Sequence, residues 1–298
     1  MARKLLKGIF LFFSLAGIAY AYHGSISSLQ QQIQQQINQE REAYKMGAIA
    51  VSYELAHDNH IYSSYSGTTK RHGGTRIGAD SLFQVGSITK SFIAAIVLQL
   101  EQEGKLNISD PLGKFLPNYP KWRRITVRQL LNHTSGIYNY TLLPQFDHVT
   151  TTRNNHKQWT PQEIVATVYH RKLYFQPAQG YRYSNTNYIL LGMLIQKVTQ
   201  QAVQQELNRR LLRHDPLDLA HSYYLPGAYP HAVSVSLVNG YFENQNVTDI
   251  NMSWVGAAGA LVSNSIDVVR WIKQLFTGHV LQYKQLQELK TVVSIPGG

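Results

Sequence analysis

The sequence predicts a mixed α and β fold, in which a short antiparallel hairpin accompanies a larger number of helices. Two runs of strand-forming residues, 47–53 and 61–65, flank an Asp58-Asn59 turn, as in a β-hairpin. The apolar run over residues 93–98 predicts a helix that is buried on all sides. Most later segments carry helical apolar patterns, and the fold class is therefore α+β.

Composition limits the classes of protein that the chain can represent. With 298 residues, of which 44% are hydrophobic and 15% charged, the chain can bury one large core or two interleaved subdomains. The chain has no cysteine, which excludes disulfides and thiolate metal sites, and we predict no cofactor. The net charge of +11 predicts attraction to anionic surfaces such as a membrane or the cell wall.

The N-terminus has the pattern of a secretory signal peptide. Three basic residues precede an apolar run over residues 8–18, and the small-x-small sequence of residues 19–21 follows. We therefore predict that residues 1–21 are a signal peptide, cleaved before Tyr22, because the apolar run is short for a membrane span. The mature protein is expected to be exported, either to the periplasm or to the medium, and to be a monomer.

The next segment, residues 22–45, is rich in glutamine and predicts a helix. Leu29, Ile33 and Ile37 recur every fourth residue and form a thin apolar stripe. The repeat is too short for a coiled coil, so we expect this helix to pack on a single domain formed by residues 46–298.

Helix signals then recur along the chain. The buried helix after Ser87 is expected to end near Gly104. Thr126 is the expected N-cap of a short helix, and the Thr160-Pro161-Gln162-Glu163 sequence has the form of a capping box. Further helices are predicted over residues 188–199 and 266–277.

His57 and His60 flank the hairpin turn and raise the question of a metal site. Polar residues beside a turn explain both histidines more simply than metal binding does. We therefore predict no metal site.

Ser87 and Lys90 are the first candidates for chemistry. Residues three apart share a helix face, so the serine hydroxyl and the lysine amine can meet. Serine is also a common N-cap and lysine a common surface residue, which are the plainer interpretations. However, a cation in the first turn of a buried helix opposes the helix dipole and loses hydration, which favours a functional role for Lys90.

A second candidate group is the Tyr183-Ser184-Asn185 loop, which enters an apolar helix. Serine becomes a nucleophile when a neighbouring base takes its proton, and Lys90 can act so if burial lowers its pKa. Tyr183 would share or replace that role. Asn185 would bind a substrate carbonyl or orient Lys90, and the Ser87 N–H would donate to an oxyanion.

These residues resemble the serine β-lactamase and penicillin-binding protein superfamily, in its class C β-lactamase and D-alanyl-D-alanine carboxypeptidase branch. Ser87-Ile88-Thr89-Lys90 is similar to the Ser-x-x-Lys motif of that family, and Tyr183-Ser184-Asn185 to its Tyr-x-Asn motif. The resemblance covers about residues 47–276. Similar surrounding segments, in the same order, are residues 99–106, 110–111, 130–136, 190–192 and 256–267.

The resemblance implies a β-lactamase/transpeptidase-like fold, with an antiparallel sheet flanked by helices and an all-helical subdomain. It implies that Ser87 is the acylated nucleophile, that Lys90 and Tyr183 form the general-base pair, and that Asn185 binds substrate. His133, in the 130–136 segment, is expected to hold a loop by hydrogen bonds rather than to touch substrate.

One family feature is missing from the sequence. The third motif, Lys/His-Thr/Ser-Gly, does not occur, and Lys290-Thr291-Val292 matches only its first two positions in a predicted helix. We therefore expect a truncated product whose sheet lacks its C-terminal strands and whose hairpin has an open edge. A second oxyanion donor would be lost with those strands.

The leading hypothesis is an exported serine hydrolase that acts on a peptidoglycan peptide, a β-lactam or an ester. The alternative is a catalytically silent, penicillin-binding-like protein that binds cell-wall material or a partner. Nucleic-acid binding is disfavoured by export and by the lack of basic runs interleaved with aromatic residues. The lack of a Gly-x-Ser-x-Gly sequence disfavours an α/β-hydrolase, and the resemblance disfavours a class A enzyme.

Overall fold

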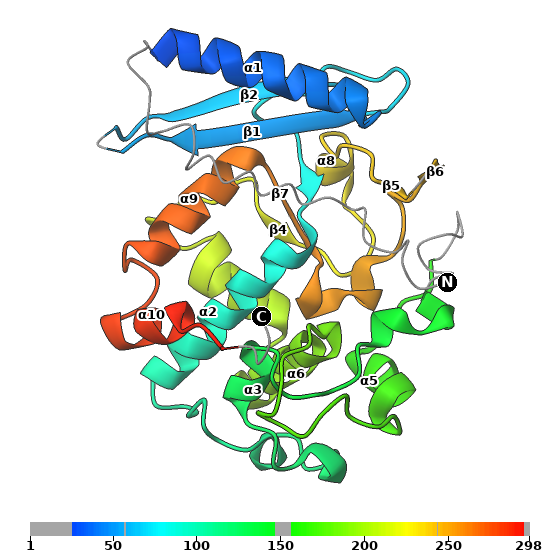
Figure 1. Ribbon diagram of the computed structural model, residues 1–298, viewed down its shortest axis with the longest axis vertical. Coiled ribbons are helices and arrows are strands. Elements are labelled where there is room, and N and C mark those ends of the chain that lie inside the picture. The colour runs from blue at the N-terminus through cyan, green and yellow to red at the C-terminus, as the bar shows by residue number, and fades with distance from the viewer. Residues whose placement is uncertain (1–25, 57, 147–155, 243, 295–298) are drawn as a thin grey trace.

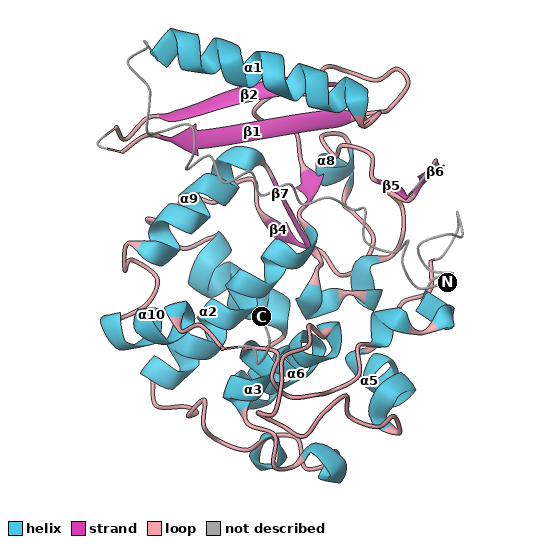
Figure 2. Cartoon of the chain, viewed as in Figure 1, coloured by secondary structure: helices cyan, strands magenta, loops and turns pink. Residues whose placement is uncertain are grey.

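The computed structural model describes residues 26–56, 58–146, 156–242 and 244–294. The predicted signal peptide and His57 lie outside these residues. Helices are the predominant secondary structure of the described residues, and the strands form small antiparallel ladders (Figures 1 and 2). The predicted α+β fold class is confirmed.

The predicted hairpin forms. Strand β1 (Ala48–Glu54) pairs antiparallel with β2 (Ile61–Gly67) along the whole length of both strands. In the turn, the Asp58 carboxylate accepts hydrogen bonds from the His60 N–H at 2.9 Å and from the Tyr62 hydroxyl at 2.7 Å. The polar residues at this turn therefore serve the turn itself.

Two helices cover the two faces of the hairpin (Figure 1). Helix α1 (Ile26–Ala43) buries Ile33 and Ile37 of the predicted apolar stripe, and α9 (Ser265–Phe276) lies against the opposite face. Lys273 of α9 forms an ion pair with Glu54 of β1, with 2.6 Å between Nζ and Oε1. Among the described residues β1 and β2 pair only with each other, so the expected open edges are present.

A second ladder fixes the start of the buried helix. Strands β3 (Phe83–Gln84) and β4 (Tyr223–Tyr224) both pair antiparallel with β7 (Leu261–Ser263). Beyond β3, the Val85 N–H donates to the Leu261 carbonyl, and the Leu261 N–H donates to the Thr89 hydroxyl. Two hydrogen bonds to Leu261 of β7, one before and one within the first turn of the following helix, therefore fix the position of that turn.

The remaining elements are mainly helical. Helix α2 begins after a 3₁₀ turn at residues 86–88 and ends at Gln102, close to the predicted end. No helix among the described residues combines the length and the apolar character that crossing a membrane would need. The other elements are α2 (Thr89–Gln102), α3 (Val127–Leu131), α5 (Pro161–Tyr169), α6 (Asn185–Thr199), α7 (Val203–Leu207) with a π-turn (Asn208–Leu212), α8 (His231–Ser234), α10 (Tyr283–Lys290), β5 (Tyr241–Phe242) and β6 (Gln245–Asn246).

The predicted helix caps are confirmed. The Thr126 hydroxyl accepts a hydrogen bond from the Gln129 N–H, and the Thr160 hydroxyl accepts one from the Glu163 N–H, each as part of a capping box. Helix α6 begins at Asn185, three residues earlier than predicted. Polar side chains in its first turn are buried with hydrogen-bond partners, which the apolar pattern does not reveal.

Helices α2 and α6 form the centre of the core and pack on each other. A 3₁₀ turn over residues 256–258 packs closely against α6, and a Cβ added to Gly192 would lie 2.8 Å from the Ala257 Cβ. Glycine is therefore the residue that permits this contact, which places the backbone of residues 256–258 beside α2.

We expect Gly192→Ala to lower the free energy of unfolding by about 1–2 kcal/mol, because overpacking outweighs the gain in helix propensity. Chemical denaturation measures the change. Gly78→Ala is the matched control, since no atom lies within 4 Å of its added Cβ. An equal or higher stability of the Gly192→Ala protein would contradict the packing argument.

Candidate active site

Ser87 lies in the 3₁₀ turn that precedes α2, and its side chain is exposed. The cap positions of the turn and of α2 are Val85 and Ile88, so Ser87 is not an N-cap. Its Oγ lies 3.0 Å from the Lys90 Nζ and 2.8 Å from the Tyr183 hydroxyl oxygen. The structure thus brings these three predicted residues together around one hydroxyl.

Lys90 is almost completely buried, with 6% of its surface exposed, so it is not a surface lysine. Besides contacting Ser87, its amine donates a hydrogen bond of 2.6 Å to the Ala258 carbonyl oxygen. Sequence reasoning did not identify this partner, because a backbone carbonyl acts without any side-chain signature. The close packing of Gly192 against the neighbouring Ala257 fixes the position of this carbonyl.

Burial lowers the pKa of Lys90 from 10.5 to about 7. The rings of Tyr183 and Tyr188 lie 4.9 and 5.5 Å from its amine and favour the charged form, but desolvation outweighs them. None of the described carboxylates forms an ion pair with Lys90. A substantial fraction of the amine is therefore neutral near pH 7.

Tyr183 lies in the loop before α6, and its hydroxyl is directed at Ser87. Burial raises the pKa of Tyr183, and the hydrogen bond with Ser87 offsets only part of that rise. The phenol is therefore protonated at neutral pH. This arrangement favours Lys90 as the base and gives Tyr183 a proton to donate.

His133 packs against the loop that carries Tyr183 and is hydrogen-bonded to it. Its φ of 61° is left-handed, and its ring centroid lies 4.5 Å from that of Tyr183. Its Nδ1 accepts a hydrogen bond from the Ser184 N–H, and its carbonyl accepts one from the Arg182 N–H. Burial, followed by the charge of Lys90, lowers the pKa of His133 to about 4, so the ring is neutral. The predicted loop-holding role is confirmed.

Asn185 is the first residue of α6 and makes different contacts from Lys90. Its N–H donates to the Asn139 Oδ1 at 3.1 Å, and its side-chain amide donates to the Thr141 Oγ1 at 3.3 Å. The Ala258 carbonyl, rather than Asn185, orients Lys90. Of the two roles predicted for Asn185, substrate binding is the one that this geometry leaves open.

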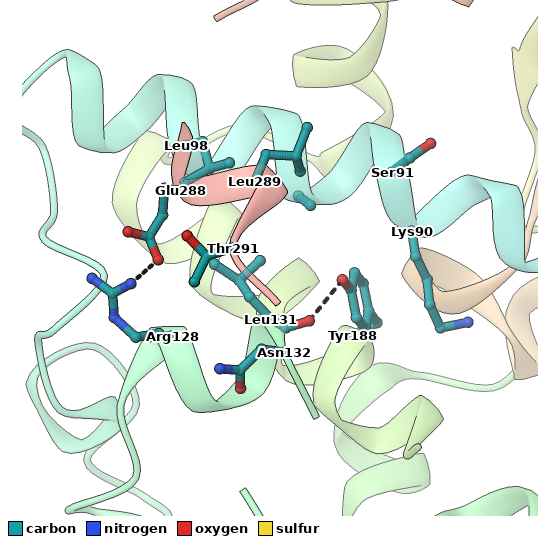
Figure 3. A pocket seen from close by; sticks show the side chains of 11 residues that line it. Lys90, Ser91, Leu98, Arg128, Leu131, Asn132, Tyr188, Glu288, Leu289 and Thr291 are labelled. Atoms are coloured by element: carbon teal, nitrogen blue, oxygen red, sulfur yellow. Dashed lines mark hydrogen bonds and ion pairs between the residues drawn. The ribbon is translucent and has the colours of Figure 1, made fainter. Parts of the chain in front are cut away.

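A cavity of about 270 Å³, lined in part by Lys90, lies between α2, α3 and α10 (Figure 3). An ion pair between Arg128 and Glu288 joins α3 to α10 at one end of the cavity.

Lys290 is the last residue of α10, and Val292 beyond it is 91% exposed. As predicted, Lys290-Thr291-Val292 does not form a strand that lines the site. Among the described residues, no cluster of metal-binding side chains occurs.

The fold and the serine–lysine–tyrosine geometry define the class of serine hydrolases that includes penicillin-binding proteins and β-lactamases. The chain belongs to the Beta-lactamase family, whose model matches residues 33–297. This confirms the resemblance found in the sequence.

Particular relatives include penicillin-binding protein 4* of Bacillus subtilis, which is 36% identical over 40% of this chain and 26% of its own length. A D-stereospecific amidohydrolase from a Streptomyces species is similar in structure, with a TM-score of 0.77, 32% identity, and coverage of 89% of this chain and 78% of its own. A D-amino acid amidase from Ochrobactrum anthropi gives a TM-score of 0.76 and 28% identity, and covers 87% and 73% of the two chains. The chain spans half or less of the length of the first curated relatives that it matches.

We expect Lys90→Met to stabilise the protein, because an amine that burial disfavours is replaced by an apolar side chain of similar length. The folded-state pKa is depressed, so the energetic cost is complete below about pH 7 and fades as the pH rises towards 10.5. The gain should be about 2 kcal/mol at pH 6, less than the full shift implies, because the Ala258 carbonyl loses its donor.

Denaturation of both proteins at pH 6 and pH 10 measures this difference. Lys197→Met, at an exposed position of α6, is the control and should show no such pH dependence. An equal gain for Lys90→Met at both pH values would contradict the burial argument.

Proposed function

We propose that this protein is an exported serine hydrolase that cleaves an amide or ester bond through an acyl-enzyme on Ser87. The observation that carries the proposal is the position of the Lys90 amine, which is buried and 3.0 Å from the Ser87 hydroxyl. A base with a pKa near the working pH is the most effective in proton transfer, and burial brings Lys90 into that range.

In the proposed first step, neutral Lys90 takes the Ser87 proton while Oγ attacks the substrate carbonyl carbon. The Ala258 carbonyl keeps the amine aligned by accepting one of its N–H groups. The Ser87 N–H would stabilise the oxyanion, and Asn185 would bind a substrate carbonyl. The bond between the carbonyl carbon and the leaving nitrogen or oxygen then breaks as the Tyr183 phenol donates its proton to that atom. Tyr183 regains a proton from protonated Lys90, and Ser87 is left acylated.

In the second step, water attacks the acyl-enzyme. Lys90 or Tyr183 accepts the water proton, the bond between Oγ and the acyl carbon breaks, and Ser87 recovers its hydrogen. The acid product leaves and the residues return to their starting protonation states. The same proton carriers therefore serve both halves of the reaction.

The similar solved structures support amides of D-amino acids as the substrate class. Two of them are described as a D-stereospecific amidohydrolase and a D-amino acid amidase. We propose that this chain likewise cleaves an amide at a D-residue, in a small molecule or in a cell-wall peptide. The signal-like N-terminus and the positive net charge support export to a compartment with anionic cell-wall or membrane surfaces.

A fluorophosphonate probe or a fluorescent penicillin should label the wild-type protein and should fail to label Ser87→Ala. Ser109→Ala removes an exposed serine elsewhere and is the matched control, which should label like the wild type. Mass spectrometry of the labelled peptide would identify Ser87 as the modified residue. Absence of labelling of the wild type at high probe concentration would refute the proposed nucleophile.

The rate of labelling by an uncharged probe should rise with pH and be half-maximal near pH 7, because only the neutral amine of Lys90 can accept a proton. Stopped-time labelling between pH 5 and pH 9 measures the profile. In Lys90→Met the rate should fall by roughly 10²–10⁴-fold, the range that general-base catalysis contributes, and the inflection near pH 7 should vanish. An unchanged inflection in that variant would assign it to another group.

A second candidate function is ligand binding without turnover. It is favoured by one observation, that no Lys/His-Thr/Ser-Gly sequence occurs in the chain. In that case a cell-wall peptide would bind equally well to the wild type and to Ser87→Ala, and no product would form. Product analysis on a D-alanyl-D-alanine peptide and on a D-amino acid amide separates the two functions.

A further inference from the structure

An arginine next to Tyr183 in sequence is stacked on an aromatic pair and forms no ion pair with a carboxylate of the described residues. The Arg182 guanidinium carbon lies 4.1 Å from the ring centroid of Tyr174. Tyr174 stacks on Tyr138 with 5.0 Å between ring centroids and an angle of 27° between the planes. Arg171 lies over the other ring of the pair, with its guanidinium carbon 5.6 Å from the Tyr138 centroid. Each ring of the stacked pair therefore contacts one cation.

Both guanidinium groups are available to an external anion. Arg182 and Arg171 are exposed, and neither forms an ion pair with a carboxylate of the described residues. By contrast, Arg128, Arg209 and Arg210 are each paired with a glutamate. Stacking on a ring holds the planar group in one orientation and leaves its N–H donors free for a carboxylate.

Hydrogen bonds connect the stacked pair to Asn185, the residue proposed to bind substrate. The Tyr174 hydroxyl accepts a hydrogen bond from the Asn139 N–H, and the Asn139 Oδ1 accepts one from the Asn185 N–H. Arg182 directly precedes Tyr183, whose hydroxyl touches Ser87. Asn185 follows Arg182 by three positions, so their Cα atoms lie within about 11 Å.

We propose that Arg182 is a carboxylate-binding subsite that selects acidic acyl donors, an inference that rests on the proposed function. The guanidinium belongs to the residue directly before Tyr183, and its stacking partner Tyr174 is hydrogen-bonded through Asn139 to Asn185, the residue proposed to bind a substrate carbonyl. An extended peptide advances about 3.3–3.6 Å per residue. A carboxylate held within the span of about 11 Å between Arg182 and Asn185 is therefore carried by a residue no more than about three positions from the reacting carbonyl, and we assign it to the acyl side, the part of the substrate that Asn185 would bind.

The test uses two peptide thioesters that share a leaving group and differ only in glutamate or glutamine at the third residue before the reacting carbonyl. Binding is measured first, by fluorescence anisotropy, on protein carrying Ser87→Ala, so that it does not depend on turnover. The glutamate peptide should bind about tenfold more tightly than the glutamine peptide, as one bidentate charged contact would give. This preference should shrink as salt is raised from 50 to 500 mM.

Arg182→Ala in the same background should remove the preference, and Arg182→Lys should retain only part of it, because lysine keeps the charge but loses the fork. Lys197→Ala removes one exposed charge from the far end of the helix that begins at Asn185, about 18 Å away, and should leave the preference intact. Melting curves check that each variant is folded.

Equal binding of the two peptides, or an equal loss of preference in Lys197→Ala, would overturn the subsite. On the chain that retains Ser87, the same tenfold preference should appear in kcat/KM for the two thioesters. If that chain is not labelled by fluorophosphonate while Ser87→Ala still prefers the glutamate peptide, the hydrolase proposal fails and the subsite stands. If labelling occurs without any preference, the subsite fails and the hydrolase stands.

Discussion

The candidate site depends on one energetically costly placement, the burial of the Lys90 amine. An amine without water is stable only if it has hydrogen-bond partners or loses its charge. Here it has two oxygens, from Ser87 and Ala258, and a pKa lowered to about 7. These conditions are also the ones that make an amine useful as a base. The same burial that costs stability therefore supplies the chemistry.

Much of the surrounding structure serves to keep that amine dry and aligned. Most residues of helices α2 and α6 are buried, the two helices pack on each other, and strand β7 fixes the first turn of α2. The contact at Gly192 brings the Ala258 carbonyl within reach of the amine. His133 holds the loop that carries Tyr183, and it remains neutral because it is buried beside a cation. A neutral imidazole avoids adding a second charge next to Lys90.

The rim of the site, formed by Arg182 and Arg171, differs from its centre in exposure to solvent. Behind Ser87 the Lys90 and His133 side chains are buried, whereas Arg182 and Arg171 are exposed. Stacking on Tyr174 and Tyr138 orders these cations without neutralising them. A buried centre strengthens the electrostatic interactions that proton transfer uses, and a solvent-exposed cationic rim can recognise an acidic substrate.

The sequence by itself determined the features that depend on neighbouring residues. The hairpin, the capped helices at Thr126 and Thr160, the buried helix and the pairing of Ser87 with Lys90 all follow from spacings of a few positions. The Tyr183-Ser184-Asn185 loop also stood out in the sequence, and the resemblance supplied its roles and the family; the similarity to known proteins confirmed the family. The short strands β4 and β7 escaped prediction, because two or three residues carry too little periodicity.

Only the tertiary structure decided which distant groups meet at the site. The Ala258 carbonyl lies 168 residues from Lys90 in sequence, and a carbonyl is common to every residue. The partners of Asn185 and the ring beneath Arg182 were likewise not predictable. Such contacts are set by how helices and loops pack, which depends on shape across the whole core rather than on any local pattern.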